Sequence, residues 1–228
     1  MPYPYRADRL ITNVLTSTVG EMTRKVFIAS LGFDATHVLR LVVERGLSSG
    51  DTVCLVTSSS QHPRAESAVK SVMDFVEKTN PRVEVKVLRL DEARFEENVA
   101  LLARCISESL KRGEVFVDVS GGPKGLVLAL YVASVIAGAG DVSLTLETTG
   151  ERVKVPVLPN PFAGVTEKQL QVLRNLPSTV TALSSKMGVS KAAVSKLLQR
   201  LREKGLVVER AGRYEVSPAG RLLLGALG

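Results

Sequence analysis

The sequence predicts an α/β protein with two domains. The first has an open, mostly parallel sheet with helices on both faces and a terminal antiparallel hairpin, and the second is a smaller, mainly helical domain. From residue 25 onward, short β-branched apolar runs alternate with longer segments whose apolar residues recur at helical spacing. Two prolines in LPNPF (158–162) then mark a linker, after which helical patterns dominate.

The charge distribution supports the same division. Residues 162–228 hold 11 Lys and Arg but 4 Asp and Glu, whereas residues 1–161 hold 19 of each kind, so the whole net charge of +7 lies in the C-terminal segment. A neutral body with a basic module indicates binding of a polyanion by that module. A merely solvated basic surface is the alternative.

Four strand–helix units account for the first domain. Three of the strands are almost entirely apolar, as expected of central parallel strands covered on both sides. Asp34 or Thr36 can cap the first helix, Pro63 begins the second, and basic residues with Gly113 close the third. The predicted strands are 26–31, 51–59, 83–91 and 114–120, and the predicted helices are 35–47, 63–79, 95–113 and 123–138.

Two further strands, 142–150 and 151–159, join through a tight Thr-Gly turn and are predicted to be antiparallel. With a strand order of 3-2-1-4, the first and fourth strands are neighbours. A ligand is then expected beyond their carboxyl ends, where the strand order reverses.

The bulk composition limits the class of protein. No apolar stretch reaches the about 18–20 residues that a membrane-spanning helix needs, and we expect no signal peptide and a cytoplasmic location. Cys54 and Cys105 lie in apolar runs and are expected to be reduced core thiols rather than metal ligands. Residues 1–21 have no clear period and are interpreted as an extension.

The segment DVSGGPKG (118–125) is the clearest candidate for a binding loop. It is neither a P-loop nor a GxGxxG motif. Ser120, Gly121 and Gly122 would expose backbone N–H groups, and Lys124 adds a cation at the start of the next helix. Amides, a helix N-terminus and an ammonium together suit a phosphate or another anion. The alternative is a tight turn that uses glycine for geometry alone.

Two other loops are expected around the same crevice. LGFDAT (31–36) follows the first strand, and the polar loop SSSQHPR (58–64) follows the second. His37 and His62 could line the pocket, although a surface or capping role is commoner for a histidine. The predicted ligand-binding residues are Gly32, Phe33, Asp34, Thr36, Ser58, Ser59, Ser120, Gly121, Gly122, Pro123 and Lys124.

The C-terminal segment has the order of a winged helix-turn-helix. Helices are predicted at 166–176, 179–188 and 190–205, a hairpin at 206–216 around Ala211-Gly212, and a last short helix at 218–227. Thr166 and Ser190 are the expected N-caps, and Gly188 permits the turn between the second and third helices. Leu183, Met187, Val189, Val194 and Leu198 are expected to pack in the angle between those two helices.

The third of these helices and the hairpin are predicted to contact DNA. The helix would enter a major groove, and the hairpin would touch phosphates or the minor groove. Dimerisation or protein binding by the same fold is the alternative. The predicted DNA-binding residues are Ser190, Lys191, Ala192, Ser195, Lys196, Gln199, Arg200, Arg210, Arg213 and Tyr214.

Two resemblances make these expectations more specific. LSSKMGVSKAAVSKLLQRLREKGLVVE is similar to the MarR- and ArsR-like winged-helix regulators. A strand ending in SLGFDATHVLR, a later strand ending in DVSGGPKGL and the C-terminal winged helix resemble, over residues 24–228, the CARF (CRISPR-associated Rossmann fold) transcriptional regulators. The expected divisions are an extension at 1–21, a CARF-like domain at 22–157, a linker at 158–165 and a winged helix at 166–228.

The CARF resemblance implies a homodimer that binds a cyclic oligoadenylate, usually cyclic tetra-adenylate, across its two-fold axis. It also implies binding to CRISPR leaders or to promoters of CRISPR-associated genes. We expect no metal or other cofactor. We therefore expect a ligand-responsive DNA-binding regulator that is not an enzyme. One alternative is a ring nuclease that uses Ser120 and Lys124 to orient a 2′-OH, although no general-base pair stands out. The other is a regulator that senses a different anion or dinucleotide.

Overall fold

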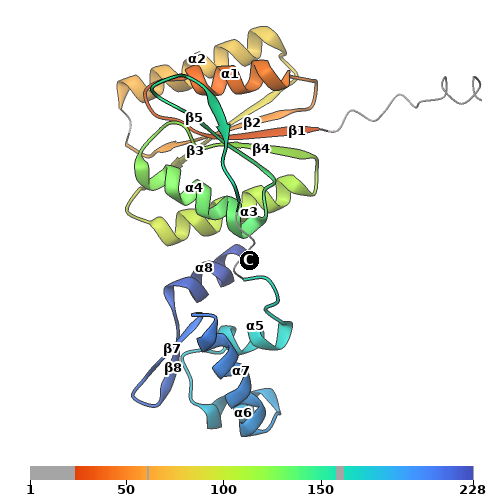
Figure 1. Ribbon diagram of the computed structural model, residues 1–228, viewed down its shortest axis with the longest axis vertical. Helices are drawn as coiled ribbons and strands as arrows, with labels where there is room; N and C mark the ends of the chain where they lie inside the picture. The colour runs from red at the N-terminus through yellow and green to blue at the C-terminus, as the bar shows by residue number, and fades with distance from the viewer. Residues whose placement is uncertain (1–23, 61, 158–161, 228) are drawn as a thin grey trace, which may run out of the picture.

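The computed structural model describes residues 24–60, 62–157 and 162–227. It has two domains, one built on a sheet and one mainly helical (Figure 1). The predicted extension and part of the predicted linker lie outside the described residues. Within the described residues, no helix is long and apolar enough to cross a membrane.

The first domain has a six-stranded sheet in the order β3-β2-β1-β4-β5-β6, which confirms the predicted 3-2-1-4 order. All neighbouring pairs are parallel except β5 and β6. The strands are β1 (Lys25–Ser30), β2 (Thr52–Ser58), β3 (Glu84–Leu90), β4 (Glu114–Asp118), β5 (Asp141–Thr145) and β6 (Arg152–Lys154). The helices are α1 (Thr36–Arg45), α2 (Pro63–Thr79), α3 (Phe95–Leu110) and α4 (Lys124–Ala137). Helices α1 and α2 cover one face of the sheet, and α3 and α4 cover the other (Figure 1).

The alternation of side chains along β1 builds a core on each face of the sheet. Val26 and Ile28 point into the core under α3 and α4, whereas Phe27 and Ala29 point into the core under α1 and α2. Phe27 stacks on Phe116 of the neighbouring strand with 5.5 Å between ring centroids. Complete burial of each large apolar side chain contributes roughly 1.5–3 kcal/mol, so the central strands are rigid supports for the loops that follow them.

Two predicted helix ends are wrong in detail. Ala35, and not Asp34 or Thr36, occupies the N-cap position of α1. Asp34 nevertheless caps this turn from one residue upstream, because its Oδ1 accepts hydrogen bonds from the Thr36 backbone N–H (2.9 Å) and hydroxyl (2.6 Å). Helix α3 ends at Leu110, before the basic residues. Gly113 instead allows β1 to approach, since an added Cβ would lie 1.8 Å from the Arg24 carbonyl oxygen.

The second domain has the predicted winged helix-turn-helix order. Its elements are α5 (Glu167–Arg174), α6 (Val180–Met187), α7 (Lys191–Glu203), β7 (Val207–Arg210), β8 (Arg213–Val216) and α8 (Pro218–Leu227). The predicted caps are confirmed, because Thr166 forms a capping box on α5 and the Ser190 hydroxyl accepts a hydrogen bond from a backbone N–H of α7. Positive φ angles at Ala211 (48°) and Gly212 (72°) make the tight hairpin turn.

The predicted packing between α6 and α7 is also confirmed. Leu183, Val194 and Leu198 are completely buried, and Met187 and Val189 pack against them. In the first domain both cysteines are free, as expected, with Cys54 buried and Cys105 partly buried.

Helix α8 of the second domain docks on α3 of the first. Arg221 donates two hydrogen bonds to the Glu96 carboxylate, at 2.8 and 3.0 Å, and the bond from Arg221 lowers the pKa of Glu96. Leu222 packs against the core under α3 and α4. Gly225 lies so close to α3 that an added Cβ would be 2.7 Å from the Cβ of Ala100. The two domains therefore share a packed interface in addition to the chain that links them.

We expect Gly225→Leu to push α8 away from α3. Overpacking of this kind costs about 1–3 kcal/mol, whereas leucine favours the helix itself. Small-angle X-ray scattering should show a larger radius of gyration with unchanged far-UV circular dichroism. Gly140→Leu is the control, because an added Cβ at Gly140 meets no atom within 4 Å. An unchanged radius of gyration in Gly225→Leu would contradict the docking role of α8.

Candidate ligand-binding site and DNA-binding face

The loops that follow β1 and β4 meet at the carboxyl edge of the sheet. An added Cβ on Gly32 would lie 2.9 Å from the Cα of Gly122, so the two backbones touch. Gly122 has a φ of +105°, a conformation that other residues rarely adopt. The sequence order therefore brings the two predicted loops together at the point where the strand order reverses.

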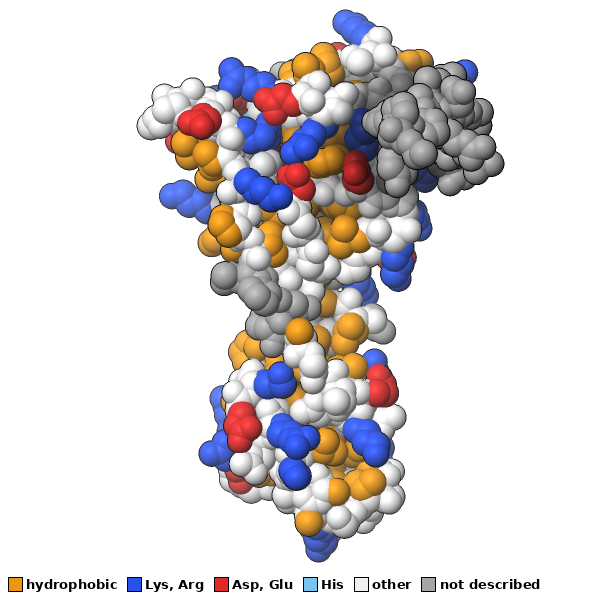
Figure 2. Space-filling view, turned by 45° about the vertical axis from the view of Figure 1, so that its right-hand side comes forward, with side chains coloured by type: hydrophobic (Ala, Val, Ile, Leu, Met, Phe, Trp, Pro, Cys, Tyr) orange, Lys and Arg blue, Asp and Glu red, His pale blue; other side chains and the backbone are white. Residues whose placement is uncertain are grey.

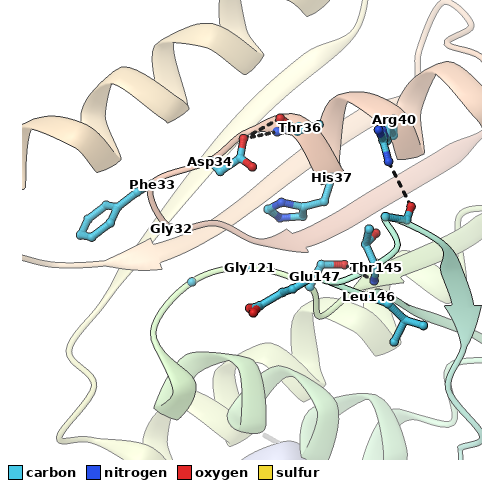
Figure 3. A pocket seen from close by; sticks show the side chains of 13 residues that line it. Gly32, Phe33, Asp34, Thr36, His37, Arg40, Gly121, Thr145, Leu146 and Glu147 are labelled. Atoms are coloured by element: carbon cyan, nitrogen blue, oxygen red, sulfur yellow. Dashed lines mark hydrogen bonds between the residues drawn. The ribbon is translucent and has the colours of Figure 1, made fainter.

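A pocket of about 330 Å³ opens on one side of this contact (Figure 3). It brings together most of the residues predicted from the first and fourth strand ends. It also includes His37, one of the two histidines considered, and a group that sequence reasoning missed. The predicted residues that line it are Gly32, Phe33, Asp34, Thr36, Ser120, Gly121 and Gly122, and the missed ones are Arg40, Thr145, Leu146, Glu147 and Gly150.

A second pocket of about 360 Å³ lies on the other side and shares Gly32, Phe33 and Gly122 with the first. Phe33 is 52% exposed at this boundary. Its ring centroid lies 4.6 Å from that of His62, and the guanidinium carbon of Arg64 lies 4.8 Å from it. The pocket is otherwise lined by Leu31, Thr57, Ser58, Ser60, His62, Ala65, Glu92 and Pro123.

Two predicted ligand residues line neither pocket. Ser59 is exposed, and its backbone N–H donates to the carbonyl of Leu90. Lys124 is exposed at the start of α4 and forms no ion pair with any described residue. The ammonium that was expected beside the glycines therefore lies outside the pocket of the single chain. Lys124 and Ser120, the pair considered for a ring nuclease, do not converge in either pocket.

Two backbone amides of the Gly-rich loop are free to bind a ligand. The Ser120 N–H donates to Oδ1 of Asp118 at 3.0 Å, and the Ser120 hydroxyl accepts from the Thr145 N–H at 2.8 Å. The N–H groups of Gly121 and Gly122 donate to no described residue. The buried hydroxyl of Thr145 also has no hydrogen-bond partner among the described residues. Unpaired amides at the start of a helix are the arrangement that binds an anion.

A buried ion pair supports this loop from below. The Asp118 carboxylate is completely buried and accepts a hydrogen bond from Arg152, which comes from β6. The same guanidinium donates to Glu44 on α1 (2.9 Å) and to the carbonyl of His37 (3.0 Å). Arg152 was not predicted as a site residue. Its hydrogen bonds connect α1, β4 and β6. Helix α1, the loop after β4 and the turn before β6 all contribute residues to the first pocket, so Arg152 holds these segments together.

The His37 ring forms the floor under Gly121. Its Nε2 lies 3.0 Å from the carbonyl oxygen of Ser30, at the end of β1. An added Cβ on Gly121 would lie only 2.3 Å from Cε1 of the ring. Glycine is therefore required at residue 121 for space, and His37 has a packing role in addition to lining the pocket.

The pocket also holds two carboxylates and one guanidinium. The hydroxyl and backbone N–H of Thr36 lower the pKa of the Asp34 carboxyl, which is therefore ionised at neutral pH. Glu147 lies on the turn between β5 and β6, and Arg40 donates to the carbonyl of Gly150 in the same turn at 3.0 Å. The described residues that line this pocket thus carry two carboxylates and one guanidinium, and the Lys124 ammonium expected there is not among them.

The predicted DNA-binding residues lie on α7 and on the β7–β8 hairpin. All of them are exposed except Tyr214, which is partly buried and pairs through its backbone with Ser178. The visible face of this domain carries several Lys and Arg side chains and fewer acidic ones (Figure 2). Gln199 donates to the Glu203 carboxylate, and the Arg210 guanidinium lies 3.9 Å from the Glu215 carboxylate, so each of these two side chains has an acidic neighbour in the same domain.

Comparison with known proteins gives matches to two family descriptions. Residues 25–156 match "Csa3 CRISPR-associated Rossmann-like domain", and residues 164–213 match the MarR family. A comparison with curated protein sequences found no match.

The similar solved structures are remote. Csm6 of Enterococcus italicus, bound to cyclic hexa-2′-fluoro-hexa-dAMP, has 14% identity and a TM-score of 0.46 over 79% of this chain and 54% of its own. Protein VC1899 from Vibrio cholerae has 10% identity and a TM-score of 0.41 over 89% and 64%. A type III CRISPR defence DNA nuclease activated by cyclic oligoadenylate has 17% identity and a TM-score of 0.42 over 78% and 30%.

The chain thus spans 30–64% of the length of these three proteins. The two family matches, in contrast, fall one in each domain of the fold. The chain belongs to the family of proteins with a Csa3-type CRISPR-associated Rossmann-like domain, and it joins that domain to a MarR-type winged helix.

Proposed function

We propose that the protein is a CRISPR-associated transcriptional regulator that binds a cyclic oligoadenylate, in the first instance cyclic tetra-adenylate, and changes its affinity for DNA in response. The observation that carries this proposal is the junction of a Csa3-type domain, with an open pocket at its topological switch point, to a basic winged helix. The target DNA would be a CRISPR leader or a promoter of CRISPR-associated genes.

The ligand would bind through its phosphates and its bases. The free N–H groups of Gly121 and Gly122 suit phosphate oxygens. The half-exposed ring of Phe33 offers a surface on which a base can stack. A ring with repeated units would engage the same residues of two subunits.

A homodimer is part of this proposal. Helix α4 follows the Gly-rich loop and has an almost wholly apolar sequence after Lys124, yet Leu128 on its outer side is 57% exposed. A helix that is hydrophobic all round is normally buried all round, and a second copy of the chain would cover this face. Dimerisation would also place the two recognition helices α7 at a fixed spacing for paired half-sites.

DNA binding is tested by charge removal at the hairpin. We expect Arg210→Ala with Arg213→Ala to lower the slope of log affinity against log salt by about 1.8, because each lost phosphate contact contributes about 0.9. Binding to fragments upstream of CRISPR-associated genes is measured by fluorescence anisotropy at several salt concentrations. Arg82→Ala with Arg112→Ala removes the same charge from exposed residues of the other domain and should leave the slope unchanged. Equal slopes in both double variants would contradict DNA binding by the hairpin.

Ligand response is tested in the same assay. Cyclic tetra-adenylate should bind the pure protein in calorimetry and should shift the DNA-binding curve, whereas linear tetra-adenylate should do neither. Chromatography of the ring after incubation distinguishes a sensor, which returns it intact, from a ring nuclease, which linearises it. A protein that binds DNA but no ring nucleotide would retain only the regulatory half of the proposal.

A further inference from the structure

The acidic side chains in the first pocket need an explanation, because the proposed ligand is itself a polyanion. Asp34 and Glu147 both line this pocket. A phosphate near either carboxylate would be repelled, and Arg40, the one guanidinium in the lining, already donates to the carbonyl of Gly150. The phosphates are therefore expected on the amides of Gly121 and Gly122, and the carboxylates must face a different part of the ligand.

The two carboxylates have unequal freedom. Oδ1 of Asp34 accepts two hydrogen bonds from Thr36, which hold this side chain to the start of α1. Glu147 is exposed and makes no hydrogen bond or ion pair with any described residue. In Figure 3 the two side chains come from opposite walls of the pocket, Asp34 from the loop after β1 and Glu147 from the turn after β5.

The backbone that carries Glu147 is held firmly although its side chain is not. The Leu146 N–H donates to the Glu151 carbonyl and the Gly150 N–H donates to the Leu146 carbonyl, each at 2.8 Å. Arg40 binds this same turn from α1 at 3.0 Å. Glu147 therefore stands at a defined place on the pocket wall with both carboxylate oxygens unpaired among the described residues.

An ionised carboxylate can only accept hydrogen bonds. It pairs well with the exocyclic amine of a base and repels a carbonyl oxygen in the same place. We infer that Glu147 is a specificity-determining residue that selects 6-amino purines over 6-oxo purines in the ring ligand, with Asp34 as a second acceptor on the opposite wall. This inference rests on the proposed function, since it assigns the base preference of the same site.

The test compares two rings whose bases differ at position 6 and, with it, at N1, which is an acceptor in adenine and an N–H donor in hypoxanthine. Cyclic tetra-adenylate carries 6-amino groups and cyclic tetra-inosinate carries 6-oxo groups. We expect the wild-type protein to prefer the adenylate ring by about tenfold or more, because a well-placed polar pair discriminates between bases to this extent. Glu147→Gln should lose most of this preference, since an amide can donate to the 6-oxo oxygen as well as accept from an amine.

Glu151→Gln is the matched control. Glu151 belongs to the same turn and is exposed, but it does not line the pocket, and its replacement removes the same charge. It should keep the wild-type preference. Calorimetric titration of each protein with each ring supplies the ratios, and thermal denaturation verifies that both variants are folded.

The outcomes separate this inference from the proposed function. If neither the wild type nor a variant binds either ring, the ligand-binding half of the proposed function is wrong, and the inference fails with it. If the wild type binds the adenylate ring but Glu147→Gln keeps the same preference, only the inference is overturned. An equal loss of preference in Glu151→Gln also overturns it, because general charge and not a contact at Glu147 would then set the preference.

Discussion

Replacement of Gly121 by alanine should abolish most of the ligand binding. The new methyl group would lie 2.3 Å from Cε1 of His37, and His37 is itself buried against the end of β1. The loop must move or the ring must leave its place, and either change removes the Gly121 and Gly122 N–H groups from their positions. Hydrogen bonds to charged groups contribute about 1.5–3 kcal/mol each, so the affinity for cyclic tetra-adenylate should fall by at least about tenfold.

The same substitution should destabilise the first domain by about 1–3 kcal/mol, the usual cost of overpacking. Calorimetry gives the affinity, and urea denaturation gives the free energy of unfolding. Gly140→Ala is the control, because it adds the same methyl group where no atom lies within 4 Å. Wild-type affinity in Gly121→Ala would show that this loop does not hold the ligand.

Replacement of Arg152 by methionine should have the largest effect on stability. The substitution keeps much of the side-chain length but leaves the Asp118 carboxylate completely buried without its guanidinium partner. Removal of one partner from a buried ion pair costs about 3–5 kcal/mol, chiefly because an uncompensated charge remains. Glu44 and the carbonyl of His37 lose a donor at the same time.

The effect is measured by urea denaturation against a matched variant. Arg89→Met removes an arginine whose pair with Glu66 is solvent-exposed, and surface pairs contribute about 0–1 kcal/mol. We expect Arg152→Met to be the less stable protein by a wide margin and to bind the ring ligand weakly. Similar unfolding midpoints for the two variants would exclude Arg152 as the support of the pocket.

Local sequence patterns predicted the fold well because the burial of apolar strands and the capping of helices depend on residues that are close together in the sequence. The apolar runs of β1, β2 and β4 allow only buried strands, and the capping residues Thr166 and Ser190 act on amides within the next three residues. The order of the strands then places the loops after β1 and β4 together. Asp34 shows the limit of this reasoning, since the N-cap position of α1 belongs to Ala35 and Asp34 accepts the bond from one residue before it.

Of the residues that line the first pocket, the sequence predicted only those that lie in or beside a motif. Arg40, Glu147 and Arg152 carry no local signal, because charged residues on an amphipathic helix or a short hairpin are normally solvated. Arg40 and Glu147 line the first pocket and Arg152 supports it, because β6 folds back antiparallel to β5 and brings residues from far along the chain to α1. Lys124 shows the opposite case, since its position in the motif did not place its side chain in either pocket of the single chain.

The docking of α8 on α3 connects the two domains through packed side chains, which a linker alone would not do. Helix α3 has 16 residues, which makes it about 24 Å long. It begins three residues after Glu92, which belongs to the wall of the second pocket, and it carries α8 on its flank. Helix α3 therefore links the edge of the second pocket to α8 through packed contacts. If the proposed ligand displaces α3, we expect the packed contact with α8 to carry that displacement to the winged helix.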